Sequence, residues 1–285
     1  MSNFTIGEAW SQAVAFIKAN LQTLVITLGI GVVVAALVQY FLVGGDQMAQ
    51  MAQLQQALRT GSLTPLATGS AAATSGVTLM LAGLVAGIIT SATEFAAMRQ
   101  GLAPGADDTR SLVSFGLVSA VLTLLLFFVV GVVAAVIIAI PIGLVIGGMA
   151  AAGGGAGGVG VVGIFLGLMA IVVGLYLSAR LSVFRAAMAA NRSTSPVFGV
   201  KQSWGLTRNC AWSIVGYLLL LVIAGLVVMM LVGGLVGVIG MALGQLAAAI
   251  LSALFVSLPV AILGTGIVAG IYRTLAPNTD ASVFS

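Results

Sequence analysis

Few residues in this sequence could carry out acid–base, nucleophilic or metal chemistry. The chain has no histidine, one cysteine, Cys210, and six acidic residues. Without histidine there is no Ser-His-Asp or Cys-His catalysis, and a lone cysteine rules out an internal disulfide and zinc sites built from His and Cys. Asp107 and Asp108 could hold magnesium, but no third acid lies close in sequence, so we expect them to cap a helix start. We therefore expect no enzymatic activity, no metal and no cofactor; the alternative is acid–base work by Glu94, Asp107 and Asp108.

One glycine motif imitates a nucleotide-binding signature. Gly153, Gly155 and Gly158 have the spacing GxGxxG. A dinucleotide fingerprint follows a strand in a βαβ unit and needs an acid about 20 residues later, whereas the flanks here are long apolar runs. We expect a glycine-rich external turn between Pro141 and Gly160, with a re-entrant loop as the alternative.

The composition indicates the environment of these residues. Of 285 residues, 61% are hydrophobic and 6% are charged, where a soluble domain has about 25% charged residues. Such a chain needs a bilayer as its solvent. We predict an all-α, polytopic helical membrane protein that forms a single integral membrane domain over residues 1–285. Runs of adequate length predict six transmembrane helices, at about residues 21–43, 77–98, 112–140, 161–179, 212–232 and 248–272.

Amphipathic helices at the membrane surface are expected beside these spans. Thr5 and Glu8 have the spacing of a capping box, and one face of the helix that follows is apolar. That face holds Ile6, Trp10, Ala13, Val14 and Ile17. We expect this helix to lie flat on the membrane and to lead into an uncleaved first span. A second short amphipathic helix is predicted from Asp46 to Arg59.

Glycine and proline predict how the spans pack and bend. Close helix contacts through GxxxG pairs are expected at Gly83 and Gly87, Gly163 and Gly167, and Gly266 and Gly270. A glycine-rich external turn is predicted from Gly233 to Gly244. Pro259 should kink the sixth span, because proline removes one hydrogen bond of the helix ladder.

The basic residues predict the orientation. With six spans and both termini inside, nine of the ten Lys and Arg residues fall on the cytoplasmic side and Arg59 alone falls outside, as the positive-inside rule requires. Half of them lie in or next to a cytoplasmic loop over residues 180–211, namely Arg180, Arg185, Arg192, Lys201 and Arg208. We predict two helices there, the second capped by Ser195 and Pro196. In that helix Val197, Val200 and Trp204 should lie on one side, and Lys201 and Arg208 on the other.

Glu94 is the only carboxylate that falls within a predicted span. One hypothesis makes it a span-end acid paired with a nearby arginine; the other makes it a site for a proton or a substrate. The basic residues of the central loop are candidates for binding anionic lipid headgroups, because each basic residue near such lipids contributes about 1 kcal/mol. They are Arg180, Arg185, Arg192, Lys201 and Arg208. The net charge of +4 therefore indicates lipid rather than nucleic acid as the counter-charge.

Two inner span ends are similar in sequence. They read Met98-Arg99-Gln100-Gly101-Leu102-Ala103-Pro104 and Tyr272-Arg273-Thr274-Leu275-Ala276-Pro277. Together with the GxxxG pair in each returning span, this similarity is typical of three helical hairpin repeats.

The interfacial helix at Phe4–Asn20, the six spans and the central segment resemble a known family. The central segment reads Ala179-Arg180-Leu181-Ser182 followed by Lys201-Gln202-Ser203-Trp204-Gly205-Leu206-Thr207-Arg208. In these features the chain resembles the glycerophosphoryl diester phosphodiesterase membrane-domain family and related uncharacterised bacterial six-span proteins. In that family the membrane domain can be attached to a soluble catalytic domain. The acids and histidine that such metal-assisted hydrolysis needs are not clustered here, so the resemblance implies a membrane domain without the enzyme.

These observations lead to one expectation and one alternative for function. We expect a non-enzymatic, multi-pass protein of the bacterial inner membrane that acts as a lipid-associated scaffold or sensor. Its partners would be anionic lipids on the cytoplasmic side, and a membrane-protein partner or a second copy of the chain. The alternative is a transporter or channel for a small amphiphilic or lipid-like substrate, with Glu94, Arg180 and Arg185 at its inner mouth.

Overall fold

The computed structural model describes residues 4–60, 70–103, 105, 108–129 and 172–276. Within these ranges all regular elements are helical. Six helices among them are long and apolar enough to cross a membrane, which confirms the prediction of an all-α polytopic membrane protein. They are Ile6–Val43, Gly76–Leu102, Thr109–Val129, Val172–Ala190, Ala211–Val236 and Leu246–Leu275. The outer parts of the third and fourth predicted spans lie outside the described residues, as do Gly163, Gly167 and the GxGxxG segment.

Helix α1 (Ile6–Thr60) contains the predicted change from interfacial helix to span. Its backbone leaves the helical region at Asn20, where φ is −119° and ψ is 15°. The Asn20 side-chain amide donates to the Phe16 carbonyl at 2.9 Å, a local bond that competes with the helix ladder. At the start of α1 the Thr5 hydroxyl accepts from the Glu8 amide at 3.3 Å, as a capping residue does. The predicted segment Asp46–Arg59 is helical, but it is not a separate helix, because α1 continues through it to Thr60 without a break.

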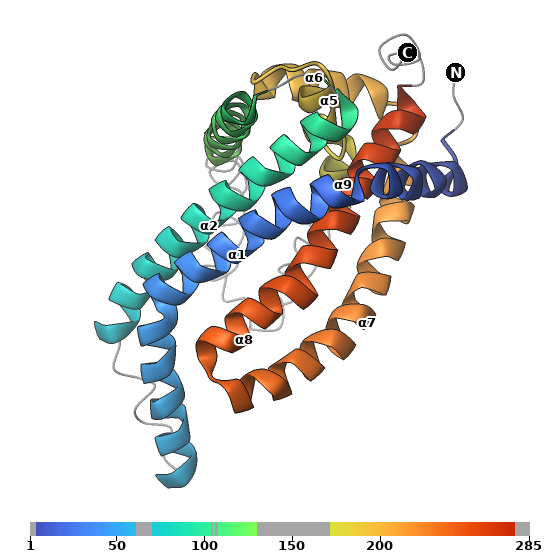
Figure 1. The fold of residues 1–285 in the computed structure, drawn as a ribbon. Helices are drawn as coiled ribbons and strands as arrows, with labels where there is room; N and C mark the ends of the chain where they lie inside the picture. Colours follow the sequence, from blue (N-terminus) through green and yellow to red (C-terminus); the bar gives the residue numbers. More distant parts are fainter. Residues whose placement is uncertain (1–3, 61–69, 104, 106–107, 130–171, 277–285) are drawn as a thin grey trace, which may run out of the picture.

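Helix α2 (Ser70–Leu102) packs along α1 (Figure 1). Two glycines allow this contact. The Thr93 side chain of α2 lies against Gly31 of α1, and a Cβ on Gly101 would lie 2.5 Å from the Phe16 ring. By contrast, a Cβ on Gly83 or Gly87 would meet no atom within 4 Å. Gly83 and Gly87 therefore do not mediate the α1–α2 contact, contrary to the prediction.

Gly266 and Gly270 do lie in a close helix contact, and their partner is the interfacial part of α1. They belong to α9 (Leu258–Leu275). A Cβ on Gly270 would lie 2.6 Å from both the Ala13 nitrogen and the Ala9 oxygen. Ala9, Ala13 and Phe16 are consequently buried, whereas Ile6 and Trp10 are each 44% exposed. The predicted membrane-facing side is therefore wrong in part, because Ala13 and Ile17 pack against α9 while Ile6 and Trp10 stay exposed.

The predicted distortion at Pro259 takes the form of a wide helical turn. Helix α8 (Gln245–Ser252) is followed by the π-helix η2 (Ala253–Ser257), which leads directly into α9. The Leu258 amide reaches back five residues to the Ala253 carbonyl, and Pro259 has no amide hydrogen to restore the usual pattern.

Helix α7 (Ala211–Leu243) overturns the prediction of a long glycine-rich turn. It stays helical past Gly233 and ends at Leu243, and the reversal into α8 is made at Gly244. Gly244 has φ 89°, a conformation that glycine adopts without a steric penalty. Glycines are tolerated inside membrane helices because the backbone has no better hydrogen-bond partner in lipid.

Two short helices form the central loop. α5 (Phe184–Ala190) follows a turn after Arg180, and α6 (Pro196–Leu206) begins after Ser195, whose hydroxyl accepts from the Phe198 amide at 3.5 Å. The predicted cap at Ser195 is confirmed. Figure 1 shows α5 and α6 at the same end of the molecule as the start of α1 and the end of α9.

Candidate functional site

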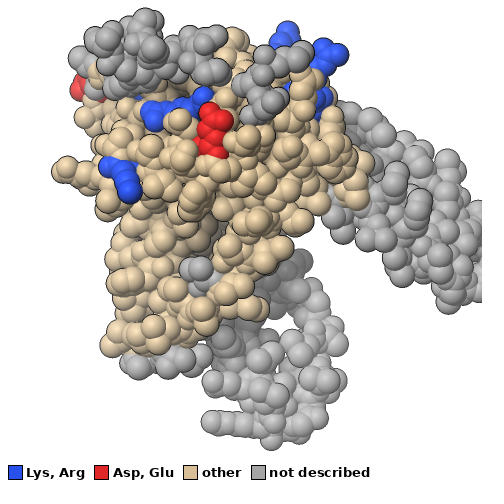
Figure 2. Space-filling model, turned by 90° about the vertical axis from the view of Figure 1, so that its right-hand side faces the viewer, with Lys and Arg blue, Asp and Glu red and all other residues tan. Residues whose placement is uncertain are grey.

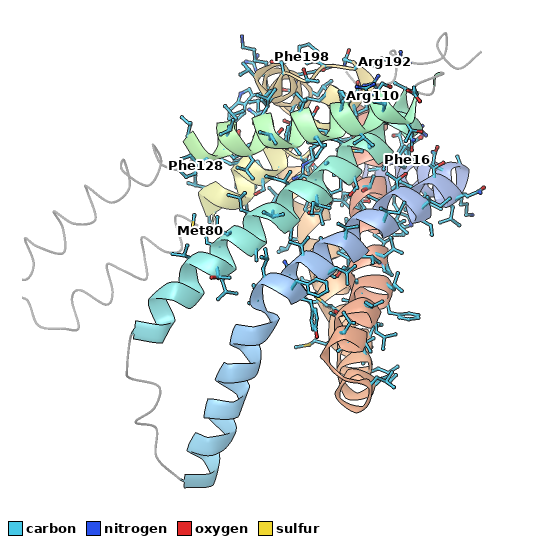
Figure 3. All side chains as sticks on the ribbon, turned by 60° about the vertical axis from the view of Figure 1, so that its left-hand side comes forward. Phe16, Met80, Arg110, Phe128, Arg192 and Phe198 are labelled. Carbon is cyan, nitrogen blue, oxygen red and sulfur yellow. The ribbon has the colours of Figure 1, made fainter. Side chains whose placement is uncertain are left out.

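Charged side chains gather at the end that carries α5 and α6. On the face shown in Figure 2, the Lys, Arg, Asp and Glu side chains lie in the upper part and the described surface below is uncharged. Figure 3 places Arg110, Arg192 and Phe198 together at this end. An uncharged band next to a charged end is the pattern expected of a protein whose middle lies in lipid.

Arg180 holds α6 in place. Its side chain is 7% exposed, donating from Nε to the Tyr176 hydroxyl at 3.0 Å and from Nη1 to the Trp204 carbonyl at 3.1 Å. Its guanidinium lies 4.5 Å from the centre of the Trp204 ring. The Arg180 carbonyl accepts from the buried hydroxyls of Ser203 at 2.6 Å and Thr207 at 3.3 Å. Because Arg180 is buried and donates to two groups inside the protein, it is an anchor rather than a headgroup ligand.

Glu94 and Arg185 form an ion pair between α2 and α5. Both side chains are half-buried, and the Arg185 guanidinium lies 5.7 Å from the Phe184 ring centre and 5.9 Å from that of Phe95. The structure therefore contains the pairing of Glu94 with an arginine that the first hypothesis expects, and Arg185 is the partner. Since the pair is only partly withdrawn from water, its attraction is screened, but it links two segments 91 residues apart.

The outward face of α6 combines basic and aromatic side chains. Val197, Lys201 and Trp204 follow the spacing i, i+4, i+7, Arg208 lies in the turn two residues after the end of α6, and all four are exposed; together they are called the exposed stripe. The predicted separation of apolar from basic residues is wrong, because this spacing places Val197 and Trp204 on the same face as Lys201. The opposite face is small or hydroxylated: Gly199, Ser203 and Thr207 are buried.

Two further arginines at this end of the molecule contact backbone carbonyls. Arg192, in the left-handed region with φ 51°, donates to the Ala103 carbonyl at 3.5 Å. Arg273 donates to the Gly101 carbonyl at 3.2 Å, and its guanidinium lies 5.1 Å from the Phe16 ring centre. The two similar span ends therefore meet in space, while the hairpin repeat itself stays a prediction.

A small cavity of about 230 Å³ lies next to the exposed stripe of α6. Tyr176, Arg208, Asn209, Trp212 and Ser213 border it, so its wall offers a guanidinium, an amide and hydroxyls. The first residues of α7 also border it, and amides in a first helical turn lack partners within the helix. This set of donors suits an anionic group.

Cys210 borders the same cavity as a free, half-buried thiol. Burial raises the pKa of the Cys210 thiol, and the nearby Arg180 guanidinium opposes that rise. The thiol is therefore protonated at neutral pH and unreactive.

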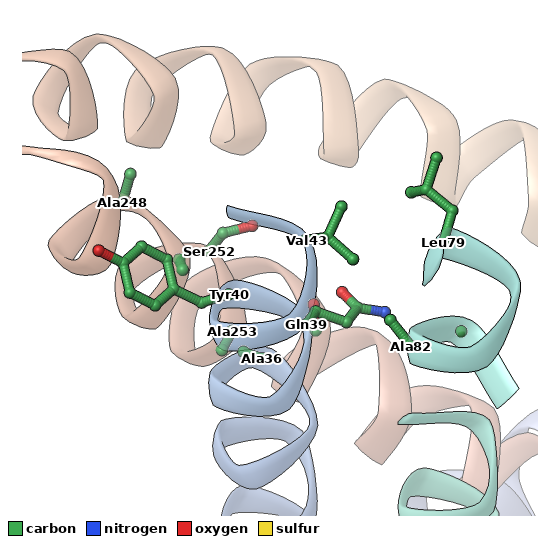
Figure 4. Close-up of a pocket in the computed structure, with 12 residues that line it drawn as sticks. Ala36, Gln39, Tyr40, Val43, Leu79, Ala82, Ala248, Ser252 and Ala253 are labelled. Carbon is green, nitrogen blue, oxygen red and sulfur yellow. The ribbon is translucent and has the colours of Figure 1, made fainter. Parts of the chain in front are cut away.

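Two of the larger cavities in the membrane-spanning part have polar residues in their walls. The outer one, about 460 Å³, lies between α1, the outer half of α2, and α8 with η2. In Figure 4 the Gln39 amide extends toward Ala82, while the Tyr40 ring lies on the side of Ala248 and Ser252. The inner one, about 380 Å³, is bordered by Thr90, Thr93 and Glu94 of α2.

Several residues of these sites escaped the sequence analysis. Three of them, Tyr176, Ser203 and Thr207, are polar residues in or beside an apolar run. The spacing of four residues between Ser203 and Thr207 could have indicated that the two hydroxyls share one helix face. Ser257, two residues before Pro259, was a second signal, because backbone distortion near proline opens space in a helix.

Metal-ligating residues do not cluster in the described part of the chain. It contains no group of three His, Cys, Asp or Glu residues that could hold a metal ion. Asp108 directly precedes the helix that starts at Thr109, and its carbonyl accepts from the Leu112 amide at 3.1 Å. That is the position expected of a helix cap, whereas Asp107 lies outside the described residues.

The chain was also compared with known proteins. No family model matches it, and neither a curated protein nor a solved structure matches it. The resemblance to the glycerophosphoryl diester phosphodiesterase membrane-domain family therefore stays a prediction. The chain is a multi-pass helical membrane protein by its six apolar helices.

Proposed function

We propose that this protein is a non-enzymatic, lipid-associated scaffold or sensor of the bacterial inner membrane. It holds anionic headgroups against the outward face of α6. In this proposal the end that carries α5 and α6 is cytoplasmic, as are both termini. A membrane-protein partner or a second copy would dock from within the same membrane.

The observation that carries the proposal is the reversed polarity of α6. A surface helix of a soluble protein buries apolar side chains and exposes polar ones. α6 buries Gly199, Ser203 and Thr207 and exposes Val197, Phe198 and Trp204 beside Lys201. Aromatic and basic side chains together are typical of the headgroup layer, where one side meets hydrocarbon and the other meets phosphate.

The neighbouring cavity adds a place for the headgroup itself. Arg208 belongs both to the exposed stripe and to the wall of the 230 Å³ cavity. A phosphate there would meet the Arg208 guanidinium, the Asn209 amide and the Ser213 hydroxyl, with Trp212, which is 64% exposed, at its side. Arginine is suited to this task because its planar guanidinium binds phosphate through two parallel hydrogen bonds.

The test is to neutralise the stripe and to measure bound lipid. At about 1 kcal/mol for each basic residue near anionic lipid, the double variant Lys201→Gln/Arg208→Gln should weaken binding of phosphatidylglycerol or cardiolipin by roughly 30-fold. Lipid that co-purifies with the full chain, measured by mass spectrometry, reports this loss. The matched control is Lys18→Gln/Arg110→Gln, which removes the same charge from two other exposed residues. Equal lipid content in the parent and the α6 variant would reject the proposal, as would an equal loss in the control.

The orientation has its own test. In a Cys210→Ala background, Lys201→Cys should react with a membrane-impermeant maleimide only after the cells are opened. A reporter fused near Gly155 should be active only outside the cytoplasm. Labelling of Lys201→Cys in intact cells would reverse the topology.

A second candidate function is transport of a small amphiphile, which the inner cavity beside Glu94 favours. Among the described residues, Glu94 alone of those bordering that cavity is ionisable, and intramembrane carboxylates often couple transport to protons. Uptake into proteoliposomes by Glu94→Gln and by the parent separates the cases. Equal flux would mean that the carboxylate is not coupled to transport.

A further inference from the structure

The two intramembrane cavities share a wall residue. Ser257, the last residue of η2, borders both the outer cavity of about 460 Å³ and the inner cavity of about 380 Å³. Each volume falls within the range of about 300–1,000 Å³ that is usual for ligand sites. The π-helix therefore lies where the inner and the outer cavity, which succeed one another along α1 and α2, come together. Wide turns of this kind are frequent at functional sites.

The wall of the inner cavity is rich in hydrogen-bond acceptors. The Thr90 hydroxyl donates to the Ala86 carbonyl at 3.0 Å, and the Thr93 hydroxyl donates to the Thr90 carbonyl at 2.9 Å. Each hydroxyl hydrogen is thereby used, and the oxygen is left as an acceptor. The Glu94 carboxylate accepts from Arg185 through one oxygen, and no other hydrogen bond to that carboxylate is found among the described residues. A group that bonds to Thr90, Thr93 or Glu94 in this cavity must therefore be a donor.

Charge balance selects among donors. Glu94 is already neutralised by Arg185, so a ligand with an ammonium or a carboxylate would bring an unpaired charge into a largely apolar space, which is costly. An uncharged head with hydroxyl groups satisfies the acceptors without that cost. Glu94 lies eight residues before the end of α2 at Leu102, which is about 12 Å of helix. A head at Glu94 is thus close to the inner surface.

The outer cavity suits a hydrocarbon chain. Small side chains of three helices make the room, namely Ala36, Ala82, Gly83, Ala248 and Ala249. Val43 and Leu79 add to the apolar part of the wall, and Gln39, Tyr40, Ser252 and Ser257 form its polar part. We propose that the two cavities form one binding site for a neutral amphiphile with a hydroxyl-bearing head beside Glu94 and a single acyl or alkyl chain that passes Ser257 into the outer cavity. This inference does not rest on headgroup binding by α6.

The glycines of the wall allow the site to be filled without disturbing the fold. Gly264 borders the inner cavity and Gly83 the outer one, and a Cβ on either would meet no atom within 4 Å. The Cβ of a leucine at either position therefore meets no neighbouring atom, and leucine also favours the helix. Gly225 of α7 is equally open and borders neither cavity, so Gly225→Leu is the matched control.

The experiment measures saturable binding of radiolabelled monooleoylglycerol to the purified full-length chain in nanodiscs. The parent and Gly225→Leu should bind about one equivalent with the same affinity within twofold. Gly264→Leu and Gly83→Leu should each bind at least tenfold more weakly while keeping the parent's thermal stability and anionic lipid content. Oleate and oleylamine, which have the same chain with a charged head, should compete at least tenfold less well than unlabelled monooleoylglycerol.

Three results would overturn the proposal. The first is no saturable binding by the parent, which would leave only partition into the bilayer. The second is binding by either filling variant that is as tight as binding by Gly225→Leu. The third is competition by oleate or oleylamine as strong as that of the neutral probe. A loss of anionic lipid on neutralising Lys201 and Arg208 would be unaffected by any of these results, so the two proposals fail separately.

Discussion

The glycine pairs Gly83–Gly87 and Gly266–Gly270 have the same spacing in the sequence, but in the structure only the second pair lies in a close helix contact. Gly270 lies where the backbone of α1 crosses α9, with the Ala13 nitrogen and the Ala9 oxygen each 2.6 Å from a Cβ position. Backbone atoms cannot rotate away, so Gly270→Ala must push the two helices apart. Gly83 faces the outer cavity, where Gly83→Ala meets nothing within 4 Å.

The magnitudes follow from two opposing effects. Replacing glycine by alanine inside a helix stabilises it by about 0.5–1 kcal/mol, and Gly83→Ala should gain that amount. Overpacking a close contact costs typically about 1–3 kcal/mol, so Gly270→Ala should lose about 0–2.5 kcal/mol in net terms. The difference between the two variants is therefore about 1–3 kcal/mol. For a chain of this size it corresponds to roughly 2–12 °C in Tm.

Thermal unfolding of the purified variants in one detergent measures this difference. A local readout is tryptic cleavage after Lys18, an exposed residue of the interfacial helix, which should accelerate in Gly270→Ala and stay unchanged in Gly83→Ala. The reasoning would be refuted if Gly270→Ala were as stable as Gly83→Ala, or if Gly83→Ala lost stability as a GxxxG contact would. Equal cleavage rates in both variants would refute it as well.

Three further predictions concern buried polar groups. Tyr217 is buried and its hydroxyl has no hydrogen-bond partner among the described residues, so Tyr217→Phe should leave the free energy of unfolding unchanged or raise it by up to about 1–3 kcal/mol; a fall in Tm would contradict this. Ser203→Ala removes one of two hydroxyls that donate to the Arg180 carbonyl and should lower the free energy of unfolding by about 0.5–1.5 kcal/mol. The double variant Ser203→Ala/Thr207→Val should lose more stability than the two single variants together. A double-mutant cycle measured by thermal unfolding checks this. Because burial raises the pKa of the Cys210 thiol, its thiolate fraction at pH 7.5 is lower than that of a free cysteine. Maleimide should therefore label Cys210 more slowly than a cysteine peptide, and the labelling rate of Cys210 should still increase with pH where that of the peptide has become constant. Equal labelling rates would contradict this.

Local features of the fold could be predicted from the sequence. The six spans, the break at Asn20 and the cap at Ser195 depend on apolar run length and on hydrogen bonds between residues three or four positions apart. The long turn after Gly233 was predicted wrongly for a related reason. Glycine is a turn signal in water, but in lipid an open backbone has no water to bind, so the helix continues to Leu243.

The candidate sites could be predicted only in part. Glu94, Lys201 and Arg208 stand out because charge is rare in this chain, and rarity is visible in a sequence. The partner of Glu94 and the internal role of Arg180 are not visible, because they depend on contacts with α5 and α6. Pro259 marks the neighbourhood of Ser257 in the sequence, but only the structure shows that the helix before Pro259 widens and that Ser257 borders two cavities.

The sequence by itself determined that the chain is a membrane protein, where its spans lie and which end carries its charges, because these follow from the cost of placing polar groups in hydrocarbon. The tertiary structure decided which glycines touch a neighbouring helix, that Arg185 pairs with Glu94, and where the cavities open. The reason is physical. A helix that is apolar all round shows no sequence periodicity to mark its buried face, since lipid and protein are equally good surroundings for leucine and valine. Helix contacts in such a chain are set by the shapes of small residues and by a few polar bonds, and those are defined only when distant segments come together.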